Sequence, residues 1–254
     1  MTETARKKAF PVFRTRLKGR AARRVRAGVA WILQGAVMTA LTGSRLLGDL
    51  SPFSVACFAA GLAAGWRPLP MALGCALYGV LSGWSAQAVS ALTGCALAGA
   101  FELLVRRLPV PRLAAARDGI TALEAGAAAL LPGLFMAGGV PYNMMTALLS
   151  SCAAALLAPS LTGAMALRPD RKRLLPDERL SCALLAEMIL IGMGSLPFAG
   201  GEIAEGAAVF VTLILSSRGP AMGAMGGIAC GAALALGSGV APAGSALGLC
   251  GLMA

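Results

Sequence analysis

Residues 119–138, GITALEAGAAALLPGLFMAG, and residues 141–160, PYNMMTALLSSCAAALLAPS, are two apolar stretches separated by Gly139 and Val140. Glu124 is the one charged residue in the two stretches. Each has the length of about 20 residues that an α-helix needs to cross the hydrocarbon core of a bilayer. The pair therefore predicts two transmembrane helices joined by a short loop.

The rest of the chain has the same character. Of its 254 residues, 57% are hydrophobic and 13% are charged, whereas soluble domains carry roughly 25% charged residues. A soluble chain of this composition could not cover its surface with polar groups, so a bilayer is the expected solvent. We predict an all-α, polytopic transmembrane helix bundle over residues 28–254, preceded by a basic cytoplasmic tail over residues 1–27.

Apolar runs bounded by charges or by Gly/Pro clusters predict about ten spans. They cover residues 28–47, 52–66, 68–83, 86–105, 119–138, 141–160, 180–198, 204–217 and 219–237, and a last segment that begins near residue 243. This tenth span is cut off at Ala254, so we expect it to be truncated.

The basic residues support this arrangement. If the connections alternate between two sides and the N-terminus is cytoplasmic, 21 of the 22 Lys and Arg residues fall on the cytoplasmic side. They lie in residues 1–27, 106–118 and 168–179 and at Arg67 and Arg218. The exception is Arg45. Cytoplasmic loops of membrane proteins carry an excess of Lys and Arg, so the pattern favours a multi-pass protein of the cell membrane with a cytoplasmic N-terminus.

The net charge of +11 could indicate a nucleic-acid partner. However, the basic residues gather at the ends of segments, and aromatic residues, which stack on bases, make up 5% of the chain. Topology and attraction to anionic lipids explain the charge better. We therefore expect a lipid bilayer with anionic lipids as a partner and no nucleic acid.

Residues for catalysis or metal binding are scarce. Histidine is absent, and the cysteines show no Cys-x-x-Cys spacing, so we interpret them as small packing residues. There is no Gly-Lys-Ser/Thr phosphate loop and no acidic cluster for a divalent metal. The sequence predicts no catalytic, cofactor-binding or metal-binding residue in this chain, which by itself is not expected to be an enzyme.

Four charged residues lie within or near predicted spans, where charges are costly and often functional. Glu102 lies one turn before Arg106, which favours a pair near the inner surface over a functional role. Arg45 lies four residues before Asp49, and an i,i+4 pair would explain both residues.

Glu124 and Glu187 are less easily explained. Glu124 lies about one and a half turns into its span, and a structural and a functional role are both open. Glu187 is flanked by Leu and Ile and has no basic neighbour in sequence. It must be protonated, pair with another helix or face water, which makes it the best candidate for an ion or proton role.

Several glycines recur at four-residue spacing and would form smooth helix stripes for close packing, within the protein or in self-association. These candidate packing residues are Gly61/Gly65, Gly79/Gly83, Gly223/Gly227/Gly231 and Gly244/Gly248.

One stretch is more specific than composition. Residues 44–61 read SRLLGDLSPFSVACFAAG: an Arg-containing turn, a short Gly-Asp-Leu loop and a Pro-Phe step into an Ala-rich span. Residues 217–220, SRGP, lead into the Gly-rich run 222–231. Together with the basic tail and the ten-span pattern, these stretches resemble the N-terminal membrane region of stage II sporulation protein E.

The resemblance implies a function for the larger protein. In that family the membrane region precedes a cytoplasmic linker and a metal-dependent Ser/Thr protein phosphatase domain. That phosphatase dephosphorylates an anti-sigma factor antagonist and so activates the forespore sigma factor. The family also acts at the division septum and contacts the cell-division tubulin homologue. The metal-binding Asp residues have no counterpart here, so a divalent metal, Mn or Mg, is expected only for a phosphatase domain beyond residue 254.

Three functions are therefore open. The preferred one is a membrane anchor and assembly module that places a sporulation-associated phosphatase at the division septum, with self-association and cell-division proteins as further partners. The alternative is the membrane subunit of a small-molecule or ion transporter, with a polar cavity near the bilayer midplane lined by Glu187 and Glu124. An intramembrane enzyme is disfavoured by the missing histidine and paired acids.

Overall fold

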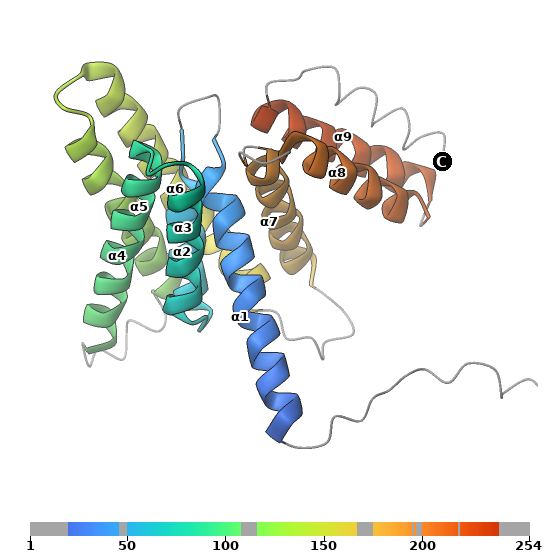
Figure 1. The fold of residues 1–254 in the computed structure, drawn as a ribbon, viewed down its shortest axis with the longest axis horizontal. Coiled ribbons are helices and arrows are strands. Elements are labelled where there is room, and N and C mark those ends of the chain that lie inside the picture. The colour runs from blue at the N-terminus through green and yellow to red at the C-terminus, as the bar shows by residue number, and fades with distance from the viewer. Residues whose placement is uncertain are drawn as a thin grey trace, which may run out of the picture.

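The computed structural model describes residues 20–45, 50–107, 116–166, 175–194, 196, 200–217 and 219–238. These residues form nine α-helices (Figure 1): α1 Arg20–Gly43, α2 Phe53–Ala63, α3 Pro68–Leu81, α4 Ala86–Arg107, α5 Arg117–Met136, α6 Pro141–Met165, α7 Pro176–Gly194, α8 Gly200–Ser216 and α9 Pro220–Ser238. The predicted all-α class is confirmed. The predicted tail 1–27 lies mostly, and the tenth span near 243 wholly, outside the described residues.

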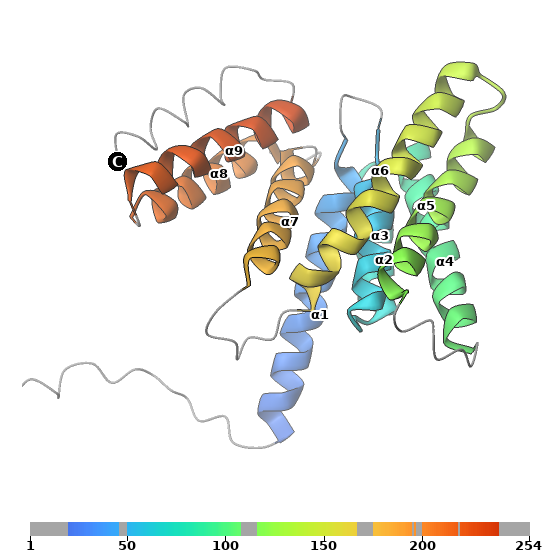
Figure 2. The same cartoon turned by 180° about the vertical axis from the view of Figure 1, so that it is seen from behind.

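Helices α1 to α7 alternate in direction, so their connections gather at two opposite ends of the bundle (Figures 1 and 2). The basic end holds the start of α1, the α2–α3 turn with Arg67, the end of α4 and the starts of α5 and α7. We call the other end, where α1 leads to α2, α3 to α4 and α5 to α6, the far end. Helices α8 and α9 form a hairpin that lies across α7.

The expectation of ten full spans is corrected by the helix lengths. Within the described residues, three helices are long and apolar enough to cross a membrane, namely α4, α5 and α6. At 1.5 Å per residue, α2 with 11 residues is about 16 Å long and α3 with 14 residues about 21 Å. Both fall short of the roughly 30 Å hydrocarbon core.

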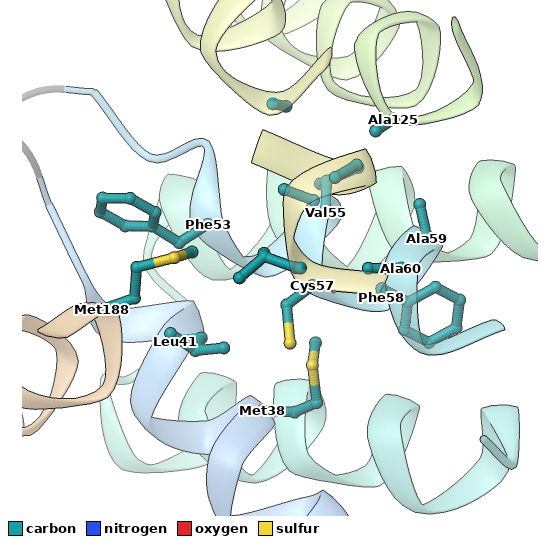
Figure 3. Packing of buried hydrophobic residues seen from close by; sticks show 14 of the residues in the cluster. Met38, Leu41, Phe53, Val55, Cys57, Phe58, Ala59, Ala60, Ala125 and Met188 are labelled. Atoms are coloured by element: carbon teal, nitrogen blue, oxygen red, sulfur yellow. The ribbon is translucent and has the colours of Figure 1, made fainter. Parts of the chain in front are cut away.

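The shortest helix occupies the centre of the bundle. Every residue of α2 from Phe53 to Leu62 is buried, and α1, α3, α4, α5 and α6 all pack against it. Figure 3 shows the side chains of α2 meeting Met38 and Leu41 of α1, Ala125 of α5 and Met188 of α7. A helix that is apolar on all sides is stable in this position because it is enclosed by protein, so it has no need to span lipid.

Side chains of different size occupy the inside and outside of α4, α5 and α6. The buried positions of these helices hold mainly small residues, and Ala98, Ala125, Ala128, Ala154 and Ala158 are fully buried. Most of their large apolar side chains lie on the outside, with Leu123 73%, Leu156 76% and Phe135 86% exposed. Small residues let helix backbones approach closely, and the exposed large residues form an apolar outer surface.

Two turns share the sequence Gly-x-x-x-Gly-Trp, at residues 61–66 and 79–84. In each, the Trp backbone N–H donates to the carbonyl of the first Gly, at 2.8 Å for Trp66 and 2.7 Å for Trp84. The second Gly has a positive φ, +84° at Gly65 and +67° at Gly83. This is the Schellman arrangement that ends a helix. Gly65 and Gly83 therefore terminate α2 and α3 and are not part of a helix-packing stripe, which corrects that prediction.

Candidate functional site

An ion-pair cluster at the basic end connects helices α2, α4 and α5. Glu102 of α4 is 5% exposed. One of its carboxylate oxygens accepts hydrogen bonds from Arg106 Nε at 2.8 Å and from Arg117 Nη2 at 3.1 Å. The predicted pair with Arg106 is confirmed, and Arg117 of α5 is an additional partner.

The same arginines also bind the end of the central helix. Arg106 donates to the Leu62 carbonyl and Arg117 to the Ala63 carbonyl, each at 3.3 Å. Both carbonyls belong to the last turn of α2, where the helix itself leaves carbonyls without a donor; the Leu62 carbonyl also accepts from the Gly65 backbone N–H at 3.1 Å. The cluster therefore joins α2, α4 and α5, and it neutralises the buried Glu102 carboxylate, which without partners would be destabilising.

Glu124 lies on the same helix as Arg117 but has a different environment. It is 4% exposed, and its Oε1 atom has no hydrogen-bond partner among the described residues. A buried carboxyl oxygen without a hydrogen-bond partner is destabilising because it has lost its hydration. Glu124 is thus the buried acid that the packing of the bundle does not explain.

Glu187 and Arg45, the other two predicted charge candidates, lie away from Glu102 and Glu124. Glu187 lies on α7 and is partly exposed. Arg45 is exposed at the far end, where its Nε donates to Gln87 Oε1 at 2.7 Å. Asp49, the partner predicted for Arg45, lies outside the described residues, so that pair stays a prediction.

A pocket of about 380 Å³ opens at the far end. It is lined by the segments after α1 and before α2 and by α2, α4, α5 and α6. Half of its lining residues are polar: Arg45, Ser51, Gln87, Ser90, Tyr142, Asn143, Thr146 and Ser150. Neither Glu124 nor Glu187 is among them, so the predicted cavity lined by these two acids is not the pocket that the described residues form.

Close helix packing depends on glycines other than the predicted pairs. A Cβ atom on Gly74 would meet the backbone carbonyl of Gly35, and one on Gly192 would meet that of Ala40. Of the predicted set, Gly61 would meet Met71 Sδ at 2.8 Å and Gly79 the Trp84 ring at 3.1 Å. Gly223, Gly227 and Gly231 are buried in α9, whereas Gly244 and Gly248 lie outside the described residues.

The cysteines of the bundle lie mainly in its core. Cys57, Cys75, Cys95 and Cys230 are buried, and Cys75 Sγ lies 3.7 Å from Cys95 Sγ. Among the described residues, no group of three or more Cys, Asp and Glu side chains is arranged to hold a metal ion.

Two functional candidates were not evident from the sequence. Arg117 precedes a predicted span and is 15 residues from Glu102, and Gln87 is 42 residues from Arg45. Only the packing of α4 against α5, and of α4 against the end of α1, reveals these partners. For Gln87, the sequence offers one signal of a role, namely that it is an isolated polar residue at the start of an apolar span.

Searches with the chain found no matching protein-family model, no matching curated protein and no matching solved structure.

Proposed function

We propose that this chain is a multi-pass membrane anchor and assembly module that holds a sporulation-associated Ser/Thr protein phosphatase at the division septum. The observation that carries the membrane part is the distribution of side chains in α4, α5 and α6, with mainly small residues inside and exposed Leu and Phe outside. Water-soluble bundles bury their large apolar residues, whereas in a bilayer the lipid chains solvate them.

Charge supports the orientation. The Arg residues at the end of α4, at the start of α5 and at the α2–α3 turn lie at the basic end, which the positive-inside rule assigns to the cytoplasm. Arg67 lies over the Trp31 ring, with its Cζ 5.6 Å from the ring centroid. The N-terminal tail would then be cytoplasmic, where its basic residues attract anionic lipid.

The phosphatase part rests on the resemblance. The stretch that carries it, residues 44–61, contributes most of α2, the central helix of the bundle. Anchoring would confine the attached domain to a surface and raise its effective concentration near partners anchored on the same membrane. No residue of this chain needs to take part in the phosphatase chemistry.

The transporter subunit is the second candidate, and the far-end pocket is the observation that favours it. Its volume lies in the range of small-molecule sites. Two features favour the anchor instead. The pocket lies at one end of the bundle, and the acids that a proton- or ion-coupled carrier would use, Glu124 and Glu187, do not line it.

A chimera tests the anchor proposal. The chain, fused at its C-terminus to a fluorescent protein, is produced in a sporulating bacterium. A second strain produces the same reporter fused to an unrelated multi-span anchor of similar size. We expect both fusions in the membrane fraction and only the first at the septum. Septal placement of both would reduce this chain to a generic anchor. Uptake of a solute by liposomes that contain the purified chain would favour the transporter.

A further inference from the structure

Among the described residues, Arg45 is the one Lys or Arg at the far end of the bundle, and it lines the far-end pocket. The other Lys and Arg residues that the structure describes lie on segments of the basic end. A lone cation on this side therefore has a role other than setting the orientation.

The guanidinium of Arg45 is held in a defined position. Its Nε donates to Gln87 Oε1 at 2.7 Å, while Gln87 Nε2 donates to the Thr42 carbonyl at 3.1 Å. Gln87 is thereby fixed to the end of α1, and it orients the arginine. Among the described residues, no carboxylate lies within ion-pair distance of Arg45 or lines the pocket.

The rest of the lining suits a small ligand with both polar and apolar groups. Ser90 and Ser150 also line the pocket and bring hydroxyl groups to it. Val55, Ala91 and Ala129 supply apolar wall. A single cation, hydroxyl groups and an apolar wall are the composition of a site for a small organic anion.

We propose that the far-end pocket binds a small oxyanion, a carboxylate or a phosphate group, from the non-cytoplasmic side, with Arg45 as the charged contact. The planar guanidinium donates two parallel hydrogen bonds to such a group. The anion belongs either to a free small molecule or to a lipid headgroup. The inference requires only the pocket and its side of the membrane, and it holds whether or not a phosphatase is attached.

The full chain in nanodiscs of phosphatidylcholine, which is zwitterionic, tests the proposal because both faces are accessible. Isothermal titration is carried out with N-acetylalanine, inorganic phosphate and the neutral N-acetylalaninamide. We expect one of the anions to bind saturably and the amide not to bind. Arg45→Gln should weaken binding by about ten- to hundredfold, as expected for loss of hydrogen bonds from a charged donor. Arg107→Gln, which removes an exposed charge at the basic end, should leave binding unchanged.

A second variant keeps the test independent of Arg45. Ser90→Leu fills the pocket while leaving the arginine in place, and it should also abolish binding. Thermal unfolding of each variant, matched to the wild type, shows that the loss does not come from misfolding. Equal losses in Arg45→Gln and Arg107→Gln, or unchanged binding in both pocket variants, would overturn the proposal.

Phosphatidylglycerol nanodiscs separate the two sources of the anion. If a lipid headgroup is the ligand, the soluble anions should no longer bind there, and phosphatidylglycerol should co-purify with the wild type but not with Arg45→Gln. If a free molecule is the ligand, its affinity should be the same in both kinds of nanodisc. Absence of soluble anion binding in phosphatidylcholine, together with lipid co-purification that is independent of Arg45, would rule the site out.

Discussion

Glu102 and Glu124 are both buried acids on neighbouring helices, yet their partners differ. Glu102 accepts hydrogen bonds from two arginines, whereas Glu124 Oε1 has no partner among the described residues. Breaking a buried ion pair is destabilising, whereas replacing an unpaired buried polar group by an apolar one can be neutral or stabilising. The two residues therefore make a matched comparison.

Methionine at each position tests this difference. Glu102→Met should lower the free energy of unfolding by about 1–2 kcal/mol, less than for a fully buried pair because both arginines are about half exposed. Glu124→Met should leave stability unchanged or raise it by about 1 kcal/mol. Thermal and denaturant unfolding in detergent measure both changes. An equally large loss in Glu124→Met would mean that Glu124 has a partner or a bound ion essential to the fold.

At the scale of helices, packing depends on where a backbone needs room for a neighbour. Gly74 of α3 lies against Gly35 of α1. The Gly74 carbonyl accepts a hydrogen bond from Thr39 Oγ1 at 3.1 Å. A Cβ atom there would also lie 2.9 Å from Met38 Cβ. The two helices therefore need a glycine at this crossing.

Gly74→Ala should destabilise the bundle by about 1–3 kcal/mol, because the added methyl group forces α1 and α3 apart. Gly206→Ala is the control, since Gly206 in α8 has open space where its Cβ would be. Alanine should there be neutral or stabilising by up to about 1 kcal/mol, through its higher helix propensity. Unfolding midpoints of the two variants give the comparison, and equal destabilisation would contradict the close α1–α3 contact.

The two Gly-x-x-x-Gly-Trp turns provide a second test at this scale. Trp66 Nε1 donates to the Met165 carbonyl at the end of α6, at 2.9 Å, whereas Trp84 is 55% exposed. Trp66→Phe should therefore cost about 1 kcal/mol through the lost hydrogen bond. Trp84→Phe keeps a ring on Gly79 and should change stability by less. A larger loss in Trp84→Phe would show that the α3–α4 turn is the more important of the two.

The whole molecule is polarised along the bundle axis, with arginines at one end and a polar pocket at the other. For the proposed membrane protein, this polarity predicts which end faces the cytoplasm. It also makes the topology measurable without knowledge of any ligand.

Cysteine labelling in a cysteine-free background checks the assignment. Arg107→Cys, at the end of α4, should react with a membrane-impermeant maleimide only after the cells are opened, whereas Val140→Cys, in the turn before α6, should react in intact cells. Both side chains are exposed in the structure, so a failure to react reports on the membrane and not on burial. The reverse pattern would invert the orientation and place the pocket in the cytoplasm.

The helical class, the apolar character and the segregation of basic residues could all be predicted from the sequence, because each depends on local composition and on where charges interrupt it. The pair of Glu102 with Arg106 was also predictable, since residues four apart lie on the same helix face. The number of full spans was not, because a short, uniformly apolar helix such as α2 looks the same whether lipid or protein surrounds it. Tertiary packing placed α2 at the centre, made Gly65 and Gly83 the ends of helices, and brought Arg117 to Glu102. It also brought Arg45 and Gln87 into one pocket, and no local pattern could predict this, because these contacts join residues far apart along the chain.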